Sequence, residues 1–289
     1  MKFGINTLLW TAAFDKSHLD MLPQFREHGF DAVEIARFEF SGFPAADVRR
    51  GIENAGLECI FCSALIGQTS LVSEDSDVRR RAREFLLEGI ERTAEIGSKT
   101  FIGPFCAPVG YLPGRRRTQE EWKHAVEELR GLVPALEQYD VTLAIEPLNR
   151  FETYFLNTMA DARRLCDQVG SPRVGILGDT FHANIEEKEI GAAFRGAGQH
   201  LRHVHACEND RGIPGSGHVE WPSLVAALRE INYDGYVVIE SFGSTIREIA
   251  AAACIWRDLA PSSEAIAYDG LRFLRGVFGV TAAGTIGRA

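Results

Sequence analysis

The second half of the chain contains four apolar stretches that each end on a residue able to bind a metal ion. Each stretch has the length and composition of a buried strand, and the intervening segments are long enough for a loop, a helix and the next strand. The end residues are Glu146, Asp179, His205 and Glu240, which close residues 141–146, 174–179, 201–205 and 236–240. Because all strands of a parallel barrel end at one face, we expect these four side chains to converge there.

Three carboxylates and one imidazole around one point suit a divalent cation. Oxygen ligands with a single imidazole favour Mn²⁺, with Mg²⁺ and Co²⁺ as alternatives, and the absence of cysteine among the ligands argues against structural zinc. A buried glutamate paired with an arginine such as Arg150 would account for either Glu146 or Glu240 alone. It would not account for metal-binding residues at four matching strand ends.

Three further polar residues lie near these strand ends. Strand alternation places His203 and His205 on one face. We assign His205 as the ligand because it is nearer the C-terminal end of the strand. We assign His203 to the core or to a layer behind the ligands. His182 follows the strand-end aspartate by three residues, so we expect a polar role for it in the site. Arg211 opens a Gly/Pro-rich loop, residues 211–217, that could lie close to a small ligand. A solvated loop cation is the alternative interpretation of Arg211.

A repeated pattern predicts the scaffold that would hold these residues. A helical segment is followed by a glycine or a short polar corner and then by an apolar strand, and a glycine there supplies the left-handed residue that ends a helix. The corners begin at Gly29, Gly56, Gly97, Tyr139, Gly170, Gly198 and Tyr233. With an opening strand at residues 2–8, the chain contains eight strands. Apolar residues at helical spacing predict a long helix over residues 78–96, and Thr118 with Glu121 predicts a capping box.

Eight strand–helix units with apolar strands indicate a parallel sheet covered by helices. We predict that they close as a single-domain (β/α)8 TIM barrel over residues 1–279, with residues 280–289 as a flexible tail. A doubly wound open sheet is the alternative, but it would not bring the ends of the last four strands to one point.

Composition excludes several classes of partner. The 289 residues carry a formal net charge of −9, so we expect no nucleic-acid partner, because an acidic protein repels phosphate. No apolar stretch approaches the ~18 residues of a membrane span, and the first residues lack the features of a signal peptide. The six cysteines form no zinc or disulfide framework. We therefore expect buried, reduced thiols in a cytoplasmic protein with no membrane partner.

The motifs around the strand ends resemble those of the ketose 3-epimerases. These are the D-tagatose, D-allulose (psicose) and L-ribulose 3-epimerases of the xylose isomerase-like barrels. The motifs are Ile145-Glu146-Pro147-Leu148-Asn149-Arg150-Phe151-Glu152, Asp179-Thr180-Phe181-His182-Ala183-Asn184-Ile185-Glu186-Glu187, His203-Val204-His205 and Ile239-Glu240-Ser241-Phe242. The resemblance covers most of the chain and is tightest from Val141 to Phe242. Ser241-Phe242 departs from the Pro-Phe pair expected after the last glutamate.

This resemblance implies roles for individual residues. The metal ligands fall on Glu146, Asp179, His205 and Glu240, and the contacts to substrate oxygens fall on Glu152, His182 and Arg211. An apolar pocket matches more loosely, at Leu8, Trp10, Phe105, Cys106 and Phe242. The resemblance also implies a ketose substrate and a homo-oligomer, either a dimer or a tetramer.

The implied chemistry explains the residue types. The proton on C3 of a ketose is too weakly acidic for an unaided carboxylate, and a cation that chelates O2 and O3 would stabilise a cis-enediolate. Inversion at C3 then needs an acid/base on each face of the planar intermediate. We expect Glu146 and Glu240 to fill these two roles.

Other activities remain compatible with the same residues. An aldose–ketose or hydroxypyruvate-type isomerase would also pass through an enediolate, and dehydration of an inosose is a further possibility. A sugar-binding barrel without turnover belongs to a different class, but binding alone does not require a base on each face. A metal-dependent DNA-repair barrel would need more histidines and a basic groove.

Overall fold

Eight parallel strands close into a barrel in the computed structural model, which describes residues 1–243 and 246–280. Each strand pairs with its neighbours in chain order, and β8 pairs with β1. The strands are β1 (Lys2–Asn6), β2 (Ala32–Ala36), β3 (Glu58–Cys62), β4 (Thr100–Gly103), β5 (Thr142–Ile145), β6 (Val174–Asp179), β7 (Leu201–His205) and β8 (Tyr236–Ile239). The predicted (β/α)8 barrel is therefore confirmed. Of the predicted tail, residues 280–289, only Val280 belongs to the described residues.

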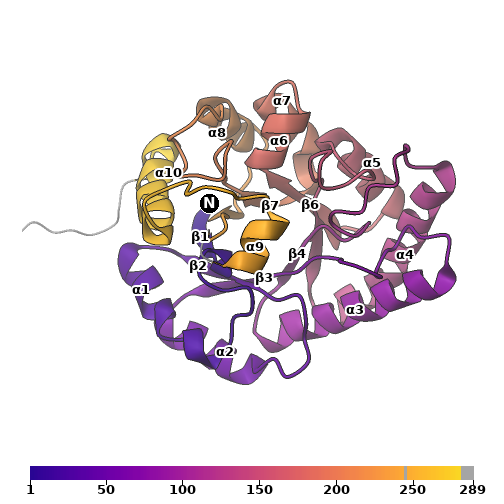
Figure 1. The fold of residues 1–289 in the computed structure, drawn as a ribbon, viewed down its shortest axis with the longest axis horizontal. Helices are drawn as coiled ribbons and strands as arrows, with labels where there is room; N and C mark the ends of the chain where they lie inside the picture. The colour runs from indigo at the N-terminus through magenta and orange to yellow at the C-terminus, as the bar shows by residue number, and fades with distance from the viewer. Residues whose placement is uncertain (244–245, 281–289) are drawn as a thin grey trace, which may run out of the picture.

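Helices form a ring around the strands (Figure 1). The helices of this ring are α1 (Met21–His28), α2 (Ala45–Ala55), α3 (Ser76–Glu95), α4 (Gln119–Gln138), α5 (Met159–Val169), α7 (Ile190–Ala197), α8 (Trp221–Glu230) and α10 (Gly270–Phe278). Short turns of helix occur at η1 (Thr7–Leu9), η2 (Lys16–His18), η3 (Gly198–His200) and η4 (Ala265–Asp269). No helix among the described residues is long and apolar enough to span a membrane.

Two short helices lie in the connections that follow strands. They are α6 (Thr180–Glu186), directly after β6, and α9 (Arg247–Ala252), after β8. Figure 1 shows α9 inside the ring formed by the other helices. The sequence patterns did not predict either helix, because both are too short to show a clear apolar period.

Local sequence signals explain where several elements begin and end. Asn6 ends the first strand two residues before the predicted boundary, because its side-chain oxygen accepts from the Leu8 backbone amide (2.8 Å) and starts η1. At the start of α4, Thr118 accepts from the Glu121 amide (3.1 Å) while the Glu121 carboxylate accepts from the Thr118 amide (2.6 Å). This confirms the predicted capping box.

Alternation along the strands separates two apolar layers. Ala32 and Ala36 of β2 belong to a cluster inside the barrel, whereas Val33 and Ile35 pack in the layer between the strands and the helices. Successive strand residues point to opposite faces, so this division follows from the period of two. The outer layer holds most of the buried phenylalanines and accounts for most of the core.

The cysteines are free thiols. Four of them are buried, as expected, but Cys59 is half-buried and Cys254 is exposed, which corrects the expectation for these two residues. Cys254 is exposed, has a positive φ of 54° and follows α9.

Gly103, the last residue of β4, is required by a close backbone approach. It has a φ of +147°, and a Cβ atom at this position would lie 1.9 Å from the carbonyl oxygen of Ser63. We expect Gly103→Ala to lower the free energy of unfolding by about 1–3 kcal/mol or more, because both the conformation and the contact exclude a side chain.

Gly131 provides the matched control for this substitution. It lies within α4, and a Cβ atom there would meet nothing within 4 Å. Gly131→Ala should raise the free energy of unfolding by about 0.5–1 kcal/mol, since alanine favours the helix. Urea unfolding curves of the two variants should shift in opposite directions, and a shift of the same sign would contradict the analysis.

Candidate active site at the barrel mouth

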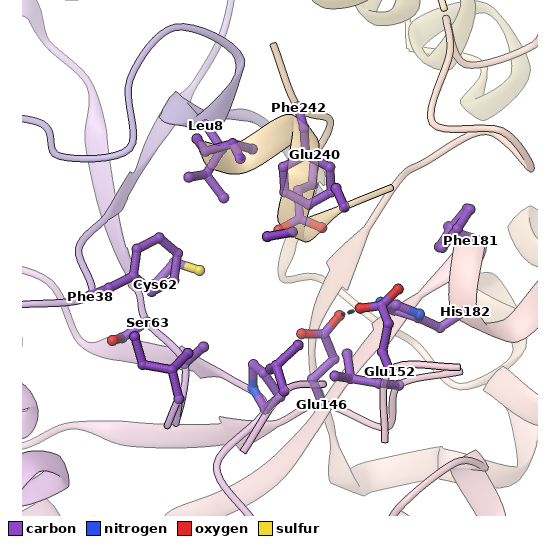
Figure 2. Close-up of a pocket in the computed structure, with 18 of the residues that line it drawn as sticks. Leu8, Phe38, Cys62, Ser63, Glu146, Glu152, Phe181, His182, Glu240 and Phe242 are labelled. Atoms are coloured by element: carbon purple, nitrogen blue, oxygen red, sulfur yellow. Dashed lines mark ion pairs between the residues drawn. The ribbon is translucent and has the colours of Figure 1, made fainter. Parts of the chain in front are cut away.

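The four predicted ligands meet at the C-terminal ends of neighbouring strands. Asp179 and His205 are register partners at the ends of β6 and β7, and Glu146 and Glu240 directly follow β5 and β8. One ligand atom from each of the four residues lies within 4.8 Å of the others, and all four side chains are buried. Figure 2 shows the carboxylates of Glu146 and Glu240 pointing toward one another.

Asp179 both ends a strand and starts a helix. One carboxylate oxygen accepts from the Phe181 backbone amide (2.6 Å), which caps α6. The other oxygen accepts from the Arg211 guanidinium (2.8 Å). Aspartate is favoured at helix N-caps, so the capping bond orients the carboxylate toward the site.

Arg211 is buried within the site, which excludes the alternative of a solvated loop cation. Its Nη1 donates to Asp179 and to Glu240, both at 2.8 Å. The guanidinium lies over the rings of Phe181 (4.3 Å) and Phe242 (4.9 Å). Arg211 has a φ of 66°, an uncommon value for a residue other than glycine, and its carbonyl accepts from the Ser241 hydroxyl (2.5 Å). Such strain is characteristic of functional positions.

His182 lies between Arg211 and Glu146. Its Nδ1 accepts from the backbone amide of Asn149 (3.1 Å), so the neutral ring carries its hydrogen on Nε2. Nε2 lies 3.5 Å from the Glu146 carboxylate (Figure 2) and 3.2 Å from the Arg211 guanidinium. Burial lowers the pKa of His182 to about 3, which outweighs the opposing effect of Asp179. His182 is therefore a neutral hydrogen-bond partner at pH 7.

A cavity of about 370 Å³ opens above these groups. Its polar end is formed by Glu146, Glu240, His182, Arg211 and Glu152. Glu152 accepts from the Asn149 side chain (2.7 Å), and burial raises its pKa. The remaining lining residues are Leu8, Ala12, Phe38, Cys62, Ser63, Ala64, Ile66, Pro104, Val109, Leu148, Phe181, Phe242, Ile249, Ala252 and Ala253. Most of these remaining residues are apolar, so the charged and histidine side chains named above are confined to one end of the cavity.

Three residues expected in the pocket do not line this cavity, and one of them, Cys106, is buried in the layer between strands and helices. Phe105 packs against Phe101, with ring centroids 4.6 Å apart, in the layer between strands and helices. Trp10 packs against Phe25 (5.0 Å) and donates to the Glu264 carboxylate (3.0 Å). Both side chains point outward from the barrel, whereas Leu8 and Phe242 line the cavity as expected. The loose motif match could not resolve which way these aromatic rings point.

Burial and mutual repulsion dominate the electrostatics of the cluster. Burial raises the pKa of the Glu146 carboxyl well above its usual range, and the neighbouring Glu240 raises it further. Burial also acts to raise the pKa of Asp179, but the charge of Arg211 holds it below its usual range. Arg150 forms its ion pair with Glu186 at 2.9 Å, so the structure does not support the alternative in which Arg150 neutralises Glu146.

The donor set fits a divalent cation. Glu146 Oε1 and His205 Nδ1 are buried and have no hydrogen-bond partner among the described residues. Both atoms belong to the four-residue cluster, in which three carboxylates face a single arginine. Oxygen atoms and one imidazole nitrogen at this spacing could hold a cation, which would satisfy the orphaned atoms and balance the excess negative charge.

Sequence patterns did not identify Glu34, which lies behind the ligands. Glu34 is the third residue of β2 and is fully buried. Its carboxylate contacts His205 Nε2 (2.9 Å) and His203 Nε2 (2.8 Å). Burial would raise its pKa, but the two histidines lower it to about 2. The signal in the sequence that could have identified Glu34 is a charged residue in the middle of an apolar strand.

Comparisons with known proteins agree with this geometry. Residues 22–277 match the family model described as the xylose isomerase-like TIM barrel. The chain is 39% identical over 275 residues to a "probable ketose 3-epimerase" of Synechocystis sp., covering 95% of this chain and 96% of the relative. It is 33% identical over 292 residues to a D-psicose 3-epimerase of Enterocloster bolteae, covering 97% of each.

A solved structure of an L-ribulose 3-epimerase superposes with a TM-score of 0.91 at 28% identity, covering 96% of this chain and 94% of the other. The match in family, in length and in barrel geometry extends over nearly the whole chain. The protein therefore belongs to the xylose isomerase-like TIM barrel family and, within it, to the ketose 3-epimerases, a group of carbohydrate epimerases.

Proposed function

We propose that the protein inverts the configuration at C3 of a free ketose through an enediolate. The observation that carries this proposal is the pair of glutamates, Glu146 and Glu240, that point toward one another from β5 and β8 across one cation-sized cluster. A site that only bound a sugar would not need a carboxylate on each side. The substrate class is that of D-tagatose, D-fructose or D-allulose, and L-ribulose, in keeping with the D-psicose and L-ribulose 3-epimerases among the relatives.

The two glutamates would divide the proton transfers. One carboxylate takes the proton from C3, the electron pair of that C–H bond becomes the C2–C3 double bond, and negative charge passes to the C2 oxygen. The other glutamate, as a carboxylic acid, gives its proton to the opposite face of C3. The electron pair of the C2–C3 double bond forms the new C3–H bond, and an electron pair on the C2 oxygen re-forms the carbonyl. The roles of Glu146 and Glu240 exchange in the reverse reaction.

The cation we propose is Mn²⁺, with Mg²⁺ and Co²⁺ as alternatives, held by Glu146, Asp179, His205 and Glu240. When bound, it would polarise the substrate oxygens and stabilise negative charge that develops on them. The orphaned atoms of the cluster support this assignment.

Three further residues would orient the substrate. Arg211, fixed by Asp179 and Glu240, presents a charged donor to the cavity. His182 is neutral and carries a hydrogen on Nε2, so it can donate to a sugar oxygen. Glu152 lines the same end of the cavity and accepts from Asn149. Together these groups would hold O1 to O3 beside the two glutamates, while Leu8 and Phe242 would contact the rest of the sugar.

Solvent isotope exchange tests the reaction itself. In D2O with Mn²⁺, a ketose epimerised by the proposed route should acquire one deuterium at C3, because the incoming proton comes from a carboxyl that exchanges with solvent. Mass spectrometry and NMR locate the label. Deuterium confined to C1 or C2 would instead indicate an aldose–ketose isomerase, and tight sugar binding without any product would indicate a sugar-binding barrel.

Substitution of the two glutamates tests the two-base role. Glu146→Gln and Glu240→Gln should each lower kcat by about 10²–10⁴-fold at saturating Mn²⁺, with cation content measured in the same samples. Asp140→Asn is the control, because Asp140 precedes β5 at the opposite end of the barrel. Near-normal turnover in either glutamine variant with the cation bound would refute the assignment.

Thermal unfolding tests the cation site without any substrate. Mn²⁺ at 100 times its dissociation constant should stabilise the wild-type protein by about 2.7 kcal/mol, and a chelator should remove that stabilisation. Asp179→Asn should abolish the shift in Tm, whereas Asp140→Asn should retain it. A Tm that does not respond to chelation or to added Mn²⁺ would count against a cation at these ligands.

Arg211→Ala tests the orienting role of the guanidinium. The variant should show a higher KM and a lower kcat together, because the substrate oxygens lose a fixed charged donor. Arg150→Ala is the matched control, since Arg150 is exposed and pairs with Glu186 outside the cavity. If the two variants have the same kinetics, Arg211 has no part in the reaction.

A further inference from the structure

One buried carboxylate, that of Glu34, is outside the set of residues proposed to touch the substrate or the cation. It contacts the proposed ligand His205 on the side of the ring that faces away from the cluster. We propose that Glu34 is a positioning residue, which fixes the ring of His205 and directs its Nδ1 toward the cation. This inference rests on the cation site in the proposed function. It concerns the layer beneath that site, inside the barrel.

The two nitrogens of His205 face different partners. Nε2 lies 2.9 Å from Glu34 Oε1. Nδ1 faces the ligand cluster, at 3.3 Å from Glu240 Oε2 and 3.8 Å from Asp179 Oδ2, and has no hydrogen-bond partner among the described residues. The imidazole therefore bridges the inner carboxylate and the mouth of the barrel.

The contact with Glu34 determines which nitrogen can bind a cation. An ionised carboxylate only accepts hydrogen bonds, so the nitrogen that bonds to it must carry the hydrogen. For the ring of His205 this places the hydrogen on Nε2 and leaves the lone pair of Nδ1 directed at the cluster. A carboxylate that accepts from the far nitrogen of a histidine ligand fixes the ring and raises its basicity.

Glu34 is itself held rigidly. Asn6, its register partner on β1, donates to Glu34 Oε1 at 2.5 Å. The Asn6 side-chain oxygen is occupied by the Leu8 amide at the start of η1, so the Asn6 amide group cannot rotate without loss of that bond. His203 Nε2 lies 2.8 Å from the other oxygen of Glu34. The contacts from Asn6 of β1 and His205 of β7 thus both hold Oε1 of Glu34, whereas the 2.8 Å approach of His203 to Oε2 makes no hydrogen bond among the described residues.

The same residues permit one competing interpretation. Ligand atoms of Glu34, His203 and His205 also lie within 4.8 Å of one another. A second cation at that position would make Glu34 a direct ligand and would need the lone pair of His205 Nε2. The bond between Glu34 and His205 favours the positioning role, and cation stoichiometry separates the two interpretations.

Calorimetric titration of the cation-free protein with Mn²⁺ tests the proposal without turnover. Glu34→Gln should weaken Mn²⁺ binding by about 10- to 100-fold. Glu121→Gln is the matched control: Glu121 is also a buried carboxylate, with a pKa lowered to about 2 against the effect of burial, but it bonds to Arg115 and Tyr154 at the start of α4. Its Mn²⁺ affinity should equal that of the wild type.

Each outcome of the titration has a defined meaning. Equal affinities in the Glu34→Gln, Glu121→Gln and wild-type proteins would overturn the positioning role and leave the proposed cation site intact. Two Mn²⁺ ions per wild-type chain, with one lost in Glu34→Gln, would overturn it in favour of direct ligation. No binding to the wild type would remove the proposed cation site together with the inference.

A measurement on the wild-type protein covers the case in which Glu34→Gln does not fold. Zn²⁺ is diamagnetic and binds imidazole well, so ¹⁵N-labelled histidine in the Zn²⁺-loaded protein reports the protonated nitrogen of His205. We expect the hydrogen on Nε2. A hydrogen on Nδ1 of the cation-loaded protein would overturn the proposal.

Discussion

The structure depends on a concentration of buried negative charge at one end of the barrel. Glu146, Asp179 and Glu240 are buried close together at the base of the cavity, and Glu34 adds a fourth carboxylate directly beneath them. Ionised carboxylates are costly to bury unless they are paired. Arg211 balances part of this charge through Asp179 and Glu240. Burial, together with the remaining negative charge, raises the pKa of Glu146, and that charge makes the site suitable for a divalent cation.

The interior of the barrel is divided into layers, and this arrangement offsets the free-energy cost of burying the carboxylates. Small and aliphatic side chains fill the middle of the barrel, Glu34 and His203 form a polar layer above them, and the proposed ligands, including His205, lie at the mouth. Every member of the polar layer comes from a strand residue that faces inward. Parallel pairing places all strand ends at one face, so groups that are distant in the chain become neighbours without any dedicated loop.

The cavity combines two chemical environments. Its floor presents carboxylates, a neutral histidine and an arginine, and its walls are mainly aliphatic and aromatic. Arg211 joins the two parts, because its guanidinium pairs with the carboxylates and also lies over Phe181 and Phe242. A small polyhydroxy ketone, with a reactive carbonyl end and a less strongly held remainder, matches this division. The membership of the chain in the ketose 3-epimerase group is consistent with such a substrate.

The sequence by itself determined the barrel, its eight strands and the four residues at the strand ends. These follow from apolar periodicity, helix-ending glycines and the spacing of charged residues, all of which are local signals. His182 and Arg211 were also predicted near the site, because each follows a strand end closely.

Only the tertiary structure decided how the remaining side chains are shared between the site and the packing. Trp10 and Phe105 pack outside the cavity, whereas Glu34 reaches His205 from a strand on the other side of the barrel. The direction of an aromatic ring, and the partner of a buried carboxylate, depend on residues far away in the chain. Packing and long-range pairing settle both, and neither leaves a periodic trace in the sequence.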